Sequence, residues 1–178
     1  MKRWSILPTL GLLTGSALLL WSIGILSAPL ARERAFAEQQ AVMARLLPGS
    51  KVFLQENSDQ YENVQALFRG ESGFVVETSV EGYAAPITLW VGVDKTGRVT
   101  GLTVRDMAET FGLGRRAARD TDFLSQFLGT NGFAAIGQDV DTLSGATVTS
   151  KAVAKAVNSA SAVVTGVDVS SGATEWEH

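Results

Sequence analysis

Residues 86–104 read PITLWVGVDKTGRVTGLTV, two strand-like halves joined by a short turn. In the first half every second residue is apolar, namely Ile87, Leu89, Val91 and Val93. This alternation is typical of a strand with one buried face. The turn DKTG at residues 94–97 ends in glycine and leads into a second run rich in β-branched residues, which favours a hairpin. The stretch therefore predicts two antiparallel strands.

The neighbouring segments extend the hairpin and supply its cover. Residues 74–80, FVVETSV, predict another strand, so we expect a three-stranded antiparallel meander. One face of such a sheet has to pack against helices. A short helix is expected around Phe123 and Phe127, and a long one over residues 151–165. The predicted fold class is α+β, an antiparallel sheet with flanking helices.

The first residues of the chain are strongly apolar. No charged side chain occurs from Trp4 to Ala31, a stretch of 28 residues. A helix that spans a bilayer needs roughly 20 apolar residues, so we expect a single N-terminal transmembrane helix, with a cleaved secretory signal as the alternative. The expected organisation is a membrane anchor at 1–31, a juxtamembrane helix or linker at 32–50, a folded domain at 51–168 and a flexible tail at 169–178.

The composition limits the possible chemistry. The chain has 178 residues, a net charge of −3, no cysteine, and a single histidine at its last position. These values give no support to nucleic-acid binding, and they exclude disulfides, a thiolate nucleophile and cysteine-ligated iron–sulfur clusters. We therefore expect neither catalytic nor metal-ligating residues, and any redox chemistry would need an organic cofactor.

Residues 141–150, DTLSGATVTS, precede the long predicted helix and are rich in hydroxyl groups. One interpretation is ordinary capping, in which Thr149 or Ser150 is the N-cap of the helix. The other is an anion site, because the first N–H groups of a helix and its dipole favour a phosphate. From the residues alone, both interpretations stay open.

DTLSGATVTS resembles the D-x-x-S/T-G-A-T-x-x-S signature of FMN-binding domains in the Rnf and Na⁺-translocating NADH:quinone reductase complexes. MAETFGLG at residues 107–114 is similar to the E-T-P-G-L-G loop of that family. The order of segments also matches, and the length is most like that of the G subunit of Rnf. The chain departs from the family pattern at Phe111, where proline is usual, and at Met107, where many members have histidine.

The resemblance implies a covalent flavin. In that family FMN is joined through its phosphate to the threonine that ends S-G-A-T, here Thr147, by an ApbE-type flavin transferase that uses FAD. The other implied cofactor-binding residues are Asp141, Ser144, Gly145, Ala146, Thr149, Ser150 and Lys151 around the phosphate, and Glu109, Thr110, Gly112, Leu113 and Gly114 on the other side of the flavin. Leu143 and Trp90 are either cover for the flavin ring or core residues.

The resemblance also implies a role and a location. The chain would be an electron-relay subunit of an Rnf-type complex that couples electron transfer between ferredoxin and NAD to ion translocation. It would have no complete catalytic site of its own. It would lie in the cytoplasmic membrane beside other subunits, with its flavin domain on the extracytoplasmic side. The alternatives are a flavoprotein subunit of the Na⁺-translocating quinone reductase, or a membrane-tethered binding or assembly module without a redox cofactor.

Overall fold

The computed structural model of the chain describes residues 33–83, 85–107, 120–143 and 145–166. The chain forms two compact units, residues 1–39 and residues 40–178. In the first unit the described residues, 33–39, are helical, and the same helix ends at residue 46 within the second unit. The second unit holds the sheet and the remaining helices, and the following description concerns this unit alone.

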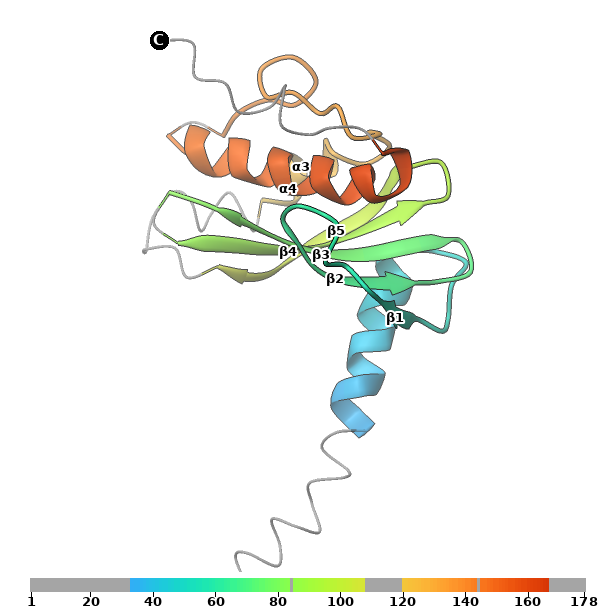
Figure 1. The fold of residues 1–178 in the computed structure, drawn as a ribbon. Coiled ribbons are helices and arrows are strands. Elements are labelled where there is room, and N and C mark those ends of the chain that lie inside the picture. Colours follow the sequence, from blue (N-terminus) through green and yellow to red (C-terminus); the bar gives the residue numbers. More distant parts are fainter. Residues whose placement is uncertain (1–32, 84, 108–119, 144, 167–178) are drawn as a thin grey trace, which may run out of the picture. The chain divides into compact units, whose positions relative to one another are not determined.

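The second unit is built on one antiparallel sheet of five strands in the order β1-β2-β3-β4-β5 (Figure 1). The strands are β1 (Leu54–Glu56), β2 (Val64–Arg69), β3 (Gly73–Glu81), β4 (Pro86–Asp94) and β5 (Val99–Met107). The register pairs Ile87 with Met107 and Val93 with Val99, so the predicted hairpin is confirmed. The predicted meander is also present, and β1 and β2 extend it by two strands at one edge.

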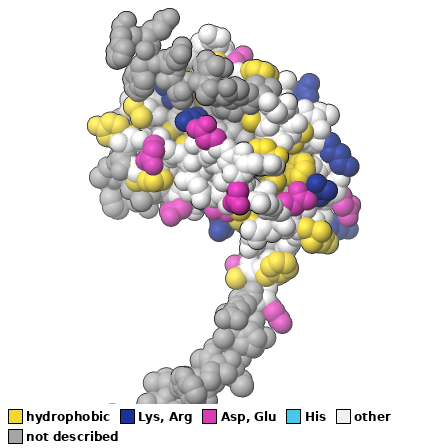
Figure 2. Space-filling view, viewed as in Figure 1, with side chains coloured by type: hydrophobic (Ala, Val, Ile, Leu, Met, Phe, Trp, Pro, Cys, Tyr) yellow, Lys and Arg dark blue, Asp and Glu magenta, His cyan; other side chains and the backbone are white. Residues whose placement is uncertain are grey.

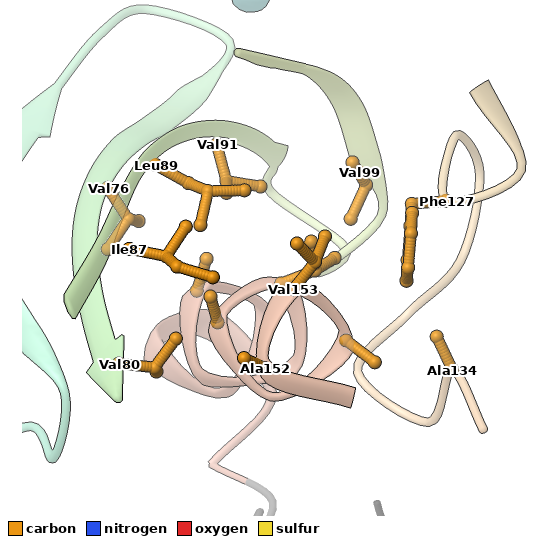
Figure 3. Packing of buried hydrophobic residues seen from close by; sticks show 14 of the residues in the cluster. Val76, Val80, Ile87, Leu89, Val91, Val99, Phe127, Ala134, Ala152 and Val153 are labelled. Carbon is orange, nitrogen blue, oxygen red and sulfur yellow. The ribbon is translucent and has the colours of Figure 1, made fainter. Parts of the chain in front are cut away.

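Helix α4 (Thr147–Thr165) lies across one face of the sheet, with α3 (Thr121–Ser125) nearby (Figure 1). Between α4 and the sheet lies the main core (Figure 3), whose fully buried members include Val76, Ile87, Leu89, Val91, Val153 and Val157. Phe123 and Phe127 join this core edge to face, with their ring centroids 5.3 Å apart. Burial of this apolar area is the main force that holds α4 on the sheet.

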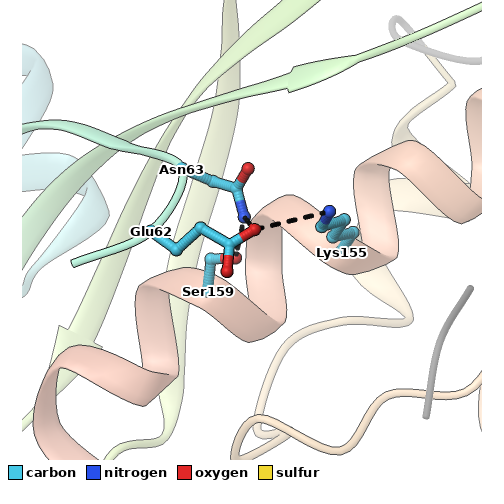
Figure 4. A network of polar contacts seen from close by, with 4 residues as sticks. All are labelled: Glu62, Asn63, Lys155 and Ser159. Carbon is cyan, nitrogen blue, oxygen red and sulfur yellow. Dashed lines mark hydrogen bonds and ion pairs between the residues drawn. The ribbon is translucent and has the colours of Figure 1, made fainter. Parts of the chain in front are cut away.

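Polar contacts fix the middle of α4 to the segment before β2 (Figure 4). Asn63 Nδ2 donates a hydrogen bond to Ser159 Oγ at 3.3 Å, and Lys155 Nζ lies 3.9 Å from Glu62 Oε1. The direction in which α4 crosses the sheet follows from a close contact at its C-terminal end. Thr165 packs so near Gly97, in the β4–β5 turn, that a Cβ on this glycine would collide with the Thr165 side chain. The C-terminal end of α4 therefore lies over the β4–β5 turn, and its N-terminal end points to the opposite end of the sheet.

The other face of the sheet is covered by the end of the helix that stops at residue 46. Its buried residues Met43 and Leu46, with Leu47 just after it, pack with Phe53, Val75 and Trp90. Gly92 and Gly101 are register partners, and a Cβ on either one would run into the Leu46 backbone. Thr100 Oγ1 donates a hydrogen bond to Leu46 O at 2.6 Å. Because these two glycines have no side chains, the helix end packs directly against the backbone of β4 and β5.

The fold-class prediction is wrong in one respect, the transmembrane helix. Within the residue ranges given above, no helix is both long enough and apolar enough to cross a membrane. The helix that ends at residue 46 carries charged side chains, including Glu38 and Arg45, and α4 carries polar residues such as Asn158 among its buried positions. The predicted span, residues 1–31, lies outside the described residues. The fold that the structure gives is a five-stranded antiparallel sheet with helices.

The surface of the described residues carries both signs of charge. Figure 2 shows acidic and basic side chains interspersed over the visible face. One ion pair of the described residues joins Arg69 Nε and Glu56 Oε1, 2.7 Å apart, across the β1–β2 pair. An exposed pair of this kind contributes little to stability, about 1 kcal/mol at most.

Candidate functional site

The start of α4 and the end of β5 lie at the same end of the sheet. The N-terminal end of α4 points to the end opposite the β4–β5 turn. At that same end β3 stops at Glu81, β4 starts at Pro86 and β5 stops at Met107, because Glu81 pairs with Pro86 and Ile87 pairs with Met107. The residues after Met107 that resemble E-T-P-G-L-G lie outside the described residues.

The start of α4 receives no capping hydrogen bond from its own N-cap residue. Its N-cap residue is Ala146, which makes no capping hydrogen bond, and the first turn contains no acidic residue. The first backbone bond of the helix runs from Ser150 N–H to Ala146 O at 2.8 Å. The N–H groups of Thr147, Val148 and Thr149 precede this bond and have no partner within the helix. These donors and the positive end of the dipole make the helix start suitable for an anion.

The helix begins earlier than the capping interpretation predicted. Thr149 and Ser150 were the candidate N-caps, but both lie inside the first turn and are buried, with 2% and 0% of their surface exposed. The physical reason is that α4 already begins at Thr147, so the N-cap position belongs to Ala146 and both residues have helical neighbours on each side. The capping interpretation of these two residues is therefore wrong.

Thr147 occupies the first helical position, and its side chain is exposed. Gly145 before it is also exposed and has φ of 79°, a left-handed conformation that glycine adopts without strain. Ala146 between them is buried. Lys151 follows Thr147 by one helical turn and is half-buried. Thr147 is thus exposed at the N-terminal end of α4, two residues after an exposed glycine.

Ser150 holds the turn that precedes Thr147. Its Oγ donates to Ala146 O at 2.9 Å and accepts from Leu143 N–H at 3.4 Å. A backbone bond from Ala146 N–H to Leu143 O, 2.9 Å long, closes the same turn. The buried hydroxyl of Ser150 therefore helps to fix the conformation of the turn that precedes Thr147. Its predicted contact with a cofactor stays a prediction.

Gln126 is a residue that sequence reasoning missed. It follows α3 directly, and its Oε1 accepts a hydrogen bond from Asp141 N–H at 2.8 Å. Asp141 is exposed and begins the D-x-x-S-G-A-T stretch. The only signal in the sequence was the position of Gln126 between the two core phenylalanines, Phe123 and Phe127.

Several predicted residues lie outside the described residues, namely Glu109, Thr110, Phe111, Gly112, Leu113, Gly114 and Ser144.

Trp90 is described, and it is buried against the helix end on the sheet face opposite α4. Its Nε1 donates a hydrogen bond to Glu77 Oε2 at 2.9 Å. Trp90 is therefore a core residue, whereas Leu143 packs at the edge of the core under α4. In the described parts of the chain no group of His, Cys, Asp and Glu is arranged to hold a metal ion.

Comparison with known proteins connects this geometry to a cofactor. Residues 82–162 match the family model of the FMN-binding domain, a span that runs from the end of β3 into α4. The chain is 27% identical over 157 residues to the G subunit of the proton-translocating ferredoxin:NAD(+) oxidoreductase complex of Clostridium ljungdahlii, covering 84% of each chain. It is 30% identical over 153 residues to the G subunit of the ion-translocating oxidoreductase complex of Salmonella typhimurium, covering 72% of this chain and 74% of the relative.

Proposed function

Because the chain belongs to the family of G subunits of ion-translocating oxidoreductase complexes, we propose that it is an electron-transfer flavoprotein that carries FMN covalently, through a phosphoester bond to Thr147. The observation that carries the proposal is the start of α4, which presents an exposed Thr147 inside the span matched by the FMN-binding family.

The described residues fit a phosphate group. The N–H groups at the start of α4 are donors for phosphate oxygens, and the helix dipole favours the negative charge by about 0.3–1 kcal/mol. Gly145 and Ala146 carry no bulky side chain, so the group can approach the backbone. Lys151, one turn along, would add a positive charge on the same side of the helix. Asp141 and Ser144 belong to the proposed site as residues of the motif.

The role of each group follows from its position. FMN, when bound, supplies the ability to accept and donate electrons, which the side chains of this protein lack. Thr147 would give up its hydroxyl proton and form the bond to the phosphorus of the FMN half of FAD, while AMP leaves. The N–H groups of the first turn and Lys151 would then hold the phosphate. The segment from Glu109 to Gly114 is proposed to line the other side of the flavin.

The setting in the cell is also part of the proposal. The curated relatives are named as subunits of ion-translocating oxidoreductase complexes, one of them for ferredoxin and NAD. We place this chain in such an Rnf-type complex, at the cytoplasmic membrane with its flavin domain on the extracytoplasmic side. An ApbE-type flavin transferase would attach the cofactor. A covalent bond prevents loss of the flavin by dilution.

In-gel flavin fluorescence tests the attachment. Membranes from cells that contain the transferase are run on a denaturing gel, and the band at 18.9 kDa is expected to fluoresce. Thr147→Ala should abolish the signal, and Thr147→Ser should retain it because the hydroxyl remains. Thr142→Ala is the matched control, since Thr142 is an exposed threonine of the same segment. A dark wild-type band would refute the covalent flavin, and a fluorescent Thr147→Ala band would refute the attachment point.

Affinity capture separates the related complexes. The tagged protein is purified from native membranes in mild detergent, and the subunits that accompany it are identified. Subunits of an Rnf-type complex are the expected result. Subunits of a Na⁺-translocating quinone reductase, or a partner set without redox proteins, would contradict the assignment to Rnf.

A further inference from the structure

We propose that Gln126 is a positioning residue for flavin attachment. It holds residues 141–147, called here the acceptor segment because Thr147 would accept the flavin, in the conformation in which Thr147 is exposed. The proposal rests on the proposed covalent attachment at Thr147. Its basis is the hydrogen bond from Asp141 N–H to Gln126 Oε1, 2.8 Å long, which joins two segments 15 residues apart in the chain.

Gln126 stands on a fixed piece of backbone. Its neighbours Phe123 and Phe127 are 2% and 0% exposed and pack edge to face in the core beneath α4. Its own N–H donates to Phe123 O at 3.3 Å. Asp120 caps the start of α3 through bonds to the N–H groups of Asp122 and Phe123, both 3.1 Å long. The side chain of Gln126 therefore extends from an anchored turn toward the exposed acceptor segment.

Contacts among the described residues hold the acceptor segment at two other places. Before it, Val140 is 1% exposed in the core, and Gly137 N–H donates to Val140 O at 2.7 Å. Toward its end, the Ser150 hydroxyl ties Leu143 and Ala146 to the first turn of α4. Residues 141 and 142 lie between these places and are exposed. The hydrogen bond to Gln126 fixes the first residue of this stretch, Asp141.

Loss of that bond should reduce the fraction of molecules whose acceptor segment is in the presented shape. An enzyme that binds only the presented shape then shows a weaker apparent affinity, in proportion to the lost fraction. One neutral hydrogen bond corresponds to about a two- to tenfold change in the equilibrium constant between this shape and the others, so the fraction falls by at most that factor. We therefore expect KM of the flavin transferase for this protein to rise by up to that factor, with kcat nearly unchanged.

The test uses full-length protein purified without flavin, FAD and purified flavin transferase, with attachment followed by fluorescence. Gln126→Met keeps the length of the side chain but removes the acceptor oxygen, and Gln126→Glu keeps an oxygen that accepts from Asp141 N–H. Gln138→Met is the matched control, because Gln138 is exposed in the loop that leads to Asp141. We expect Gln126→Met to raise KM by up to about tenfold, Gln126→Glu to restore most of the loss, and Gln138→Met to match the wild type.

Two results would overturn the proposal. One is a KM of Gln126→Met equal to that of the wild type, and the other is an equal loss in Gln126→Met and Gln126→Glu. Amide hydrogen exchange of the flavin-free protein gives a readout independent of attachment, because Asp141 N–H should exchange faster in Gln126→Met than in the wild type. If the wild type takes up no flavin, the proposed function fails, and the exchange of Asp141 still decides whether Gln126 positions the segment. Equal exchange rates would refute the positioning.

Discussion

Replacement of Gly92 by alanine tests how the N-terminal helix end is seated on the sheet. Gly92 lies on β4, and a Cβ added there would lie 2.6 Å from the carbonyl carbon of Leu46 and 2.8 Å from Thr100 Oγ1, with Leu46 O closer still. Ordinary contacts of a Cβ begin near 3.4 Å. The obstacle is mainly backbone, so the helix end has to move away from the sheet.

The magnitude follows from three contributions. Overpacking of this kind costs about 1–3 kcal/mol. The shift also strains or breaks the Thr100–Leu46 hydrogen bond, which adds about 1 kcal/mol. Lower backbone entropy of the unfolded chain returns about 0.4–1 kcal/mol, because Gly92 does not need a positive φ. The expected net loss in the free energy of unfolding is about 1–3.6 kcal/mol, or about 2–14 °C in Tm.

The assay is thermal and urea unfolding of the full-length protein in detergent, followed by circular dichroism. Amide hydrogen exchange of residues 40–47 should accelerate in the same variant, because these residues lose their packing against the sheet. Gly129→Ala is the control: its φ of 82° strains alanine, but no heavy atom of the described residues lies within 4 Å of the added Cβ. That variant should lose stability without a change in exchange at residues 40–47. A Gly92→Ala protein as stable as the wild type would refute the reasoning.

Three further substitutions address the core and the β4–β5 turn. Thr78→Val should raise the free energy of unfolding by about 1 kcal/mol in urea unfolding, because Thr78 Oγ1 is buried without a hydrogen-bond partner among the described residues. Phe127→Ala should lower it by about 3–5 kcal/mol in the same assay, through the cavity left in the core. Burial raises the pKa of Asp94, but hydrogen bonds from Thr96 and from the Arg98 N–H outweigh it and the pKa lies below its ordinary value. The charge of Asp94 therefore stabilises the fold above the unfolded pKa, and this contribution is lost as the pH falls through the folded pKa; Asp94→Asn should flatten the dependence of Tm on pH below about pH 4.

The parts of the fold with a regular apolar pattern were predictable from the sequence. The alternation in residues 86–104 and the β-branched run at 74–80 indicated three strands, which the register confirms. β1 and β2 escaped prediction because residues 51–70 are mixed and polar, and these strands form only by adding to an existing edge. The packing of the helix end on Gly92 and Gly101 was not predictable either, because it depends on a register that pairs two glycines across two strands.

At the candidate site the motif named residues, and the structure adds how the described ones are arranged. Thr147 is exposed at the start of α4, as an attachment point requires. Ser150 was expected to support the phosphate or cap the helix; it does not cap the helix, because α4 begins at Thr147, and its buried hydroxyl bonds to Leu143 and Ala146 in the turn before the helix. Gln126 could not be inferred, because its partner is a backbone N–H group and leaves no pattern in the sequence.

Peptide mapping of the native protein tests the central claim most directly. The protein is purified from membranes of cells that contain the transferase and digested with trypsin, which can release residues 120–151 as one peptide, between Arg119 and Lys151. We predict that this peptide carries the mass of one FMN less one water, and that fragmentation assigns the addition to Thr147. An unmodified peptide, or a flavin assigned to any residue other than Thr147, would contradict the account.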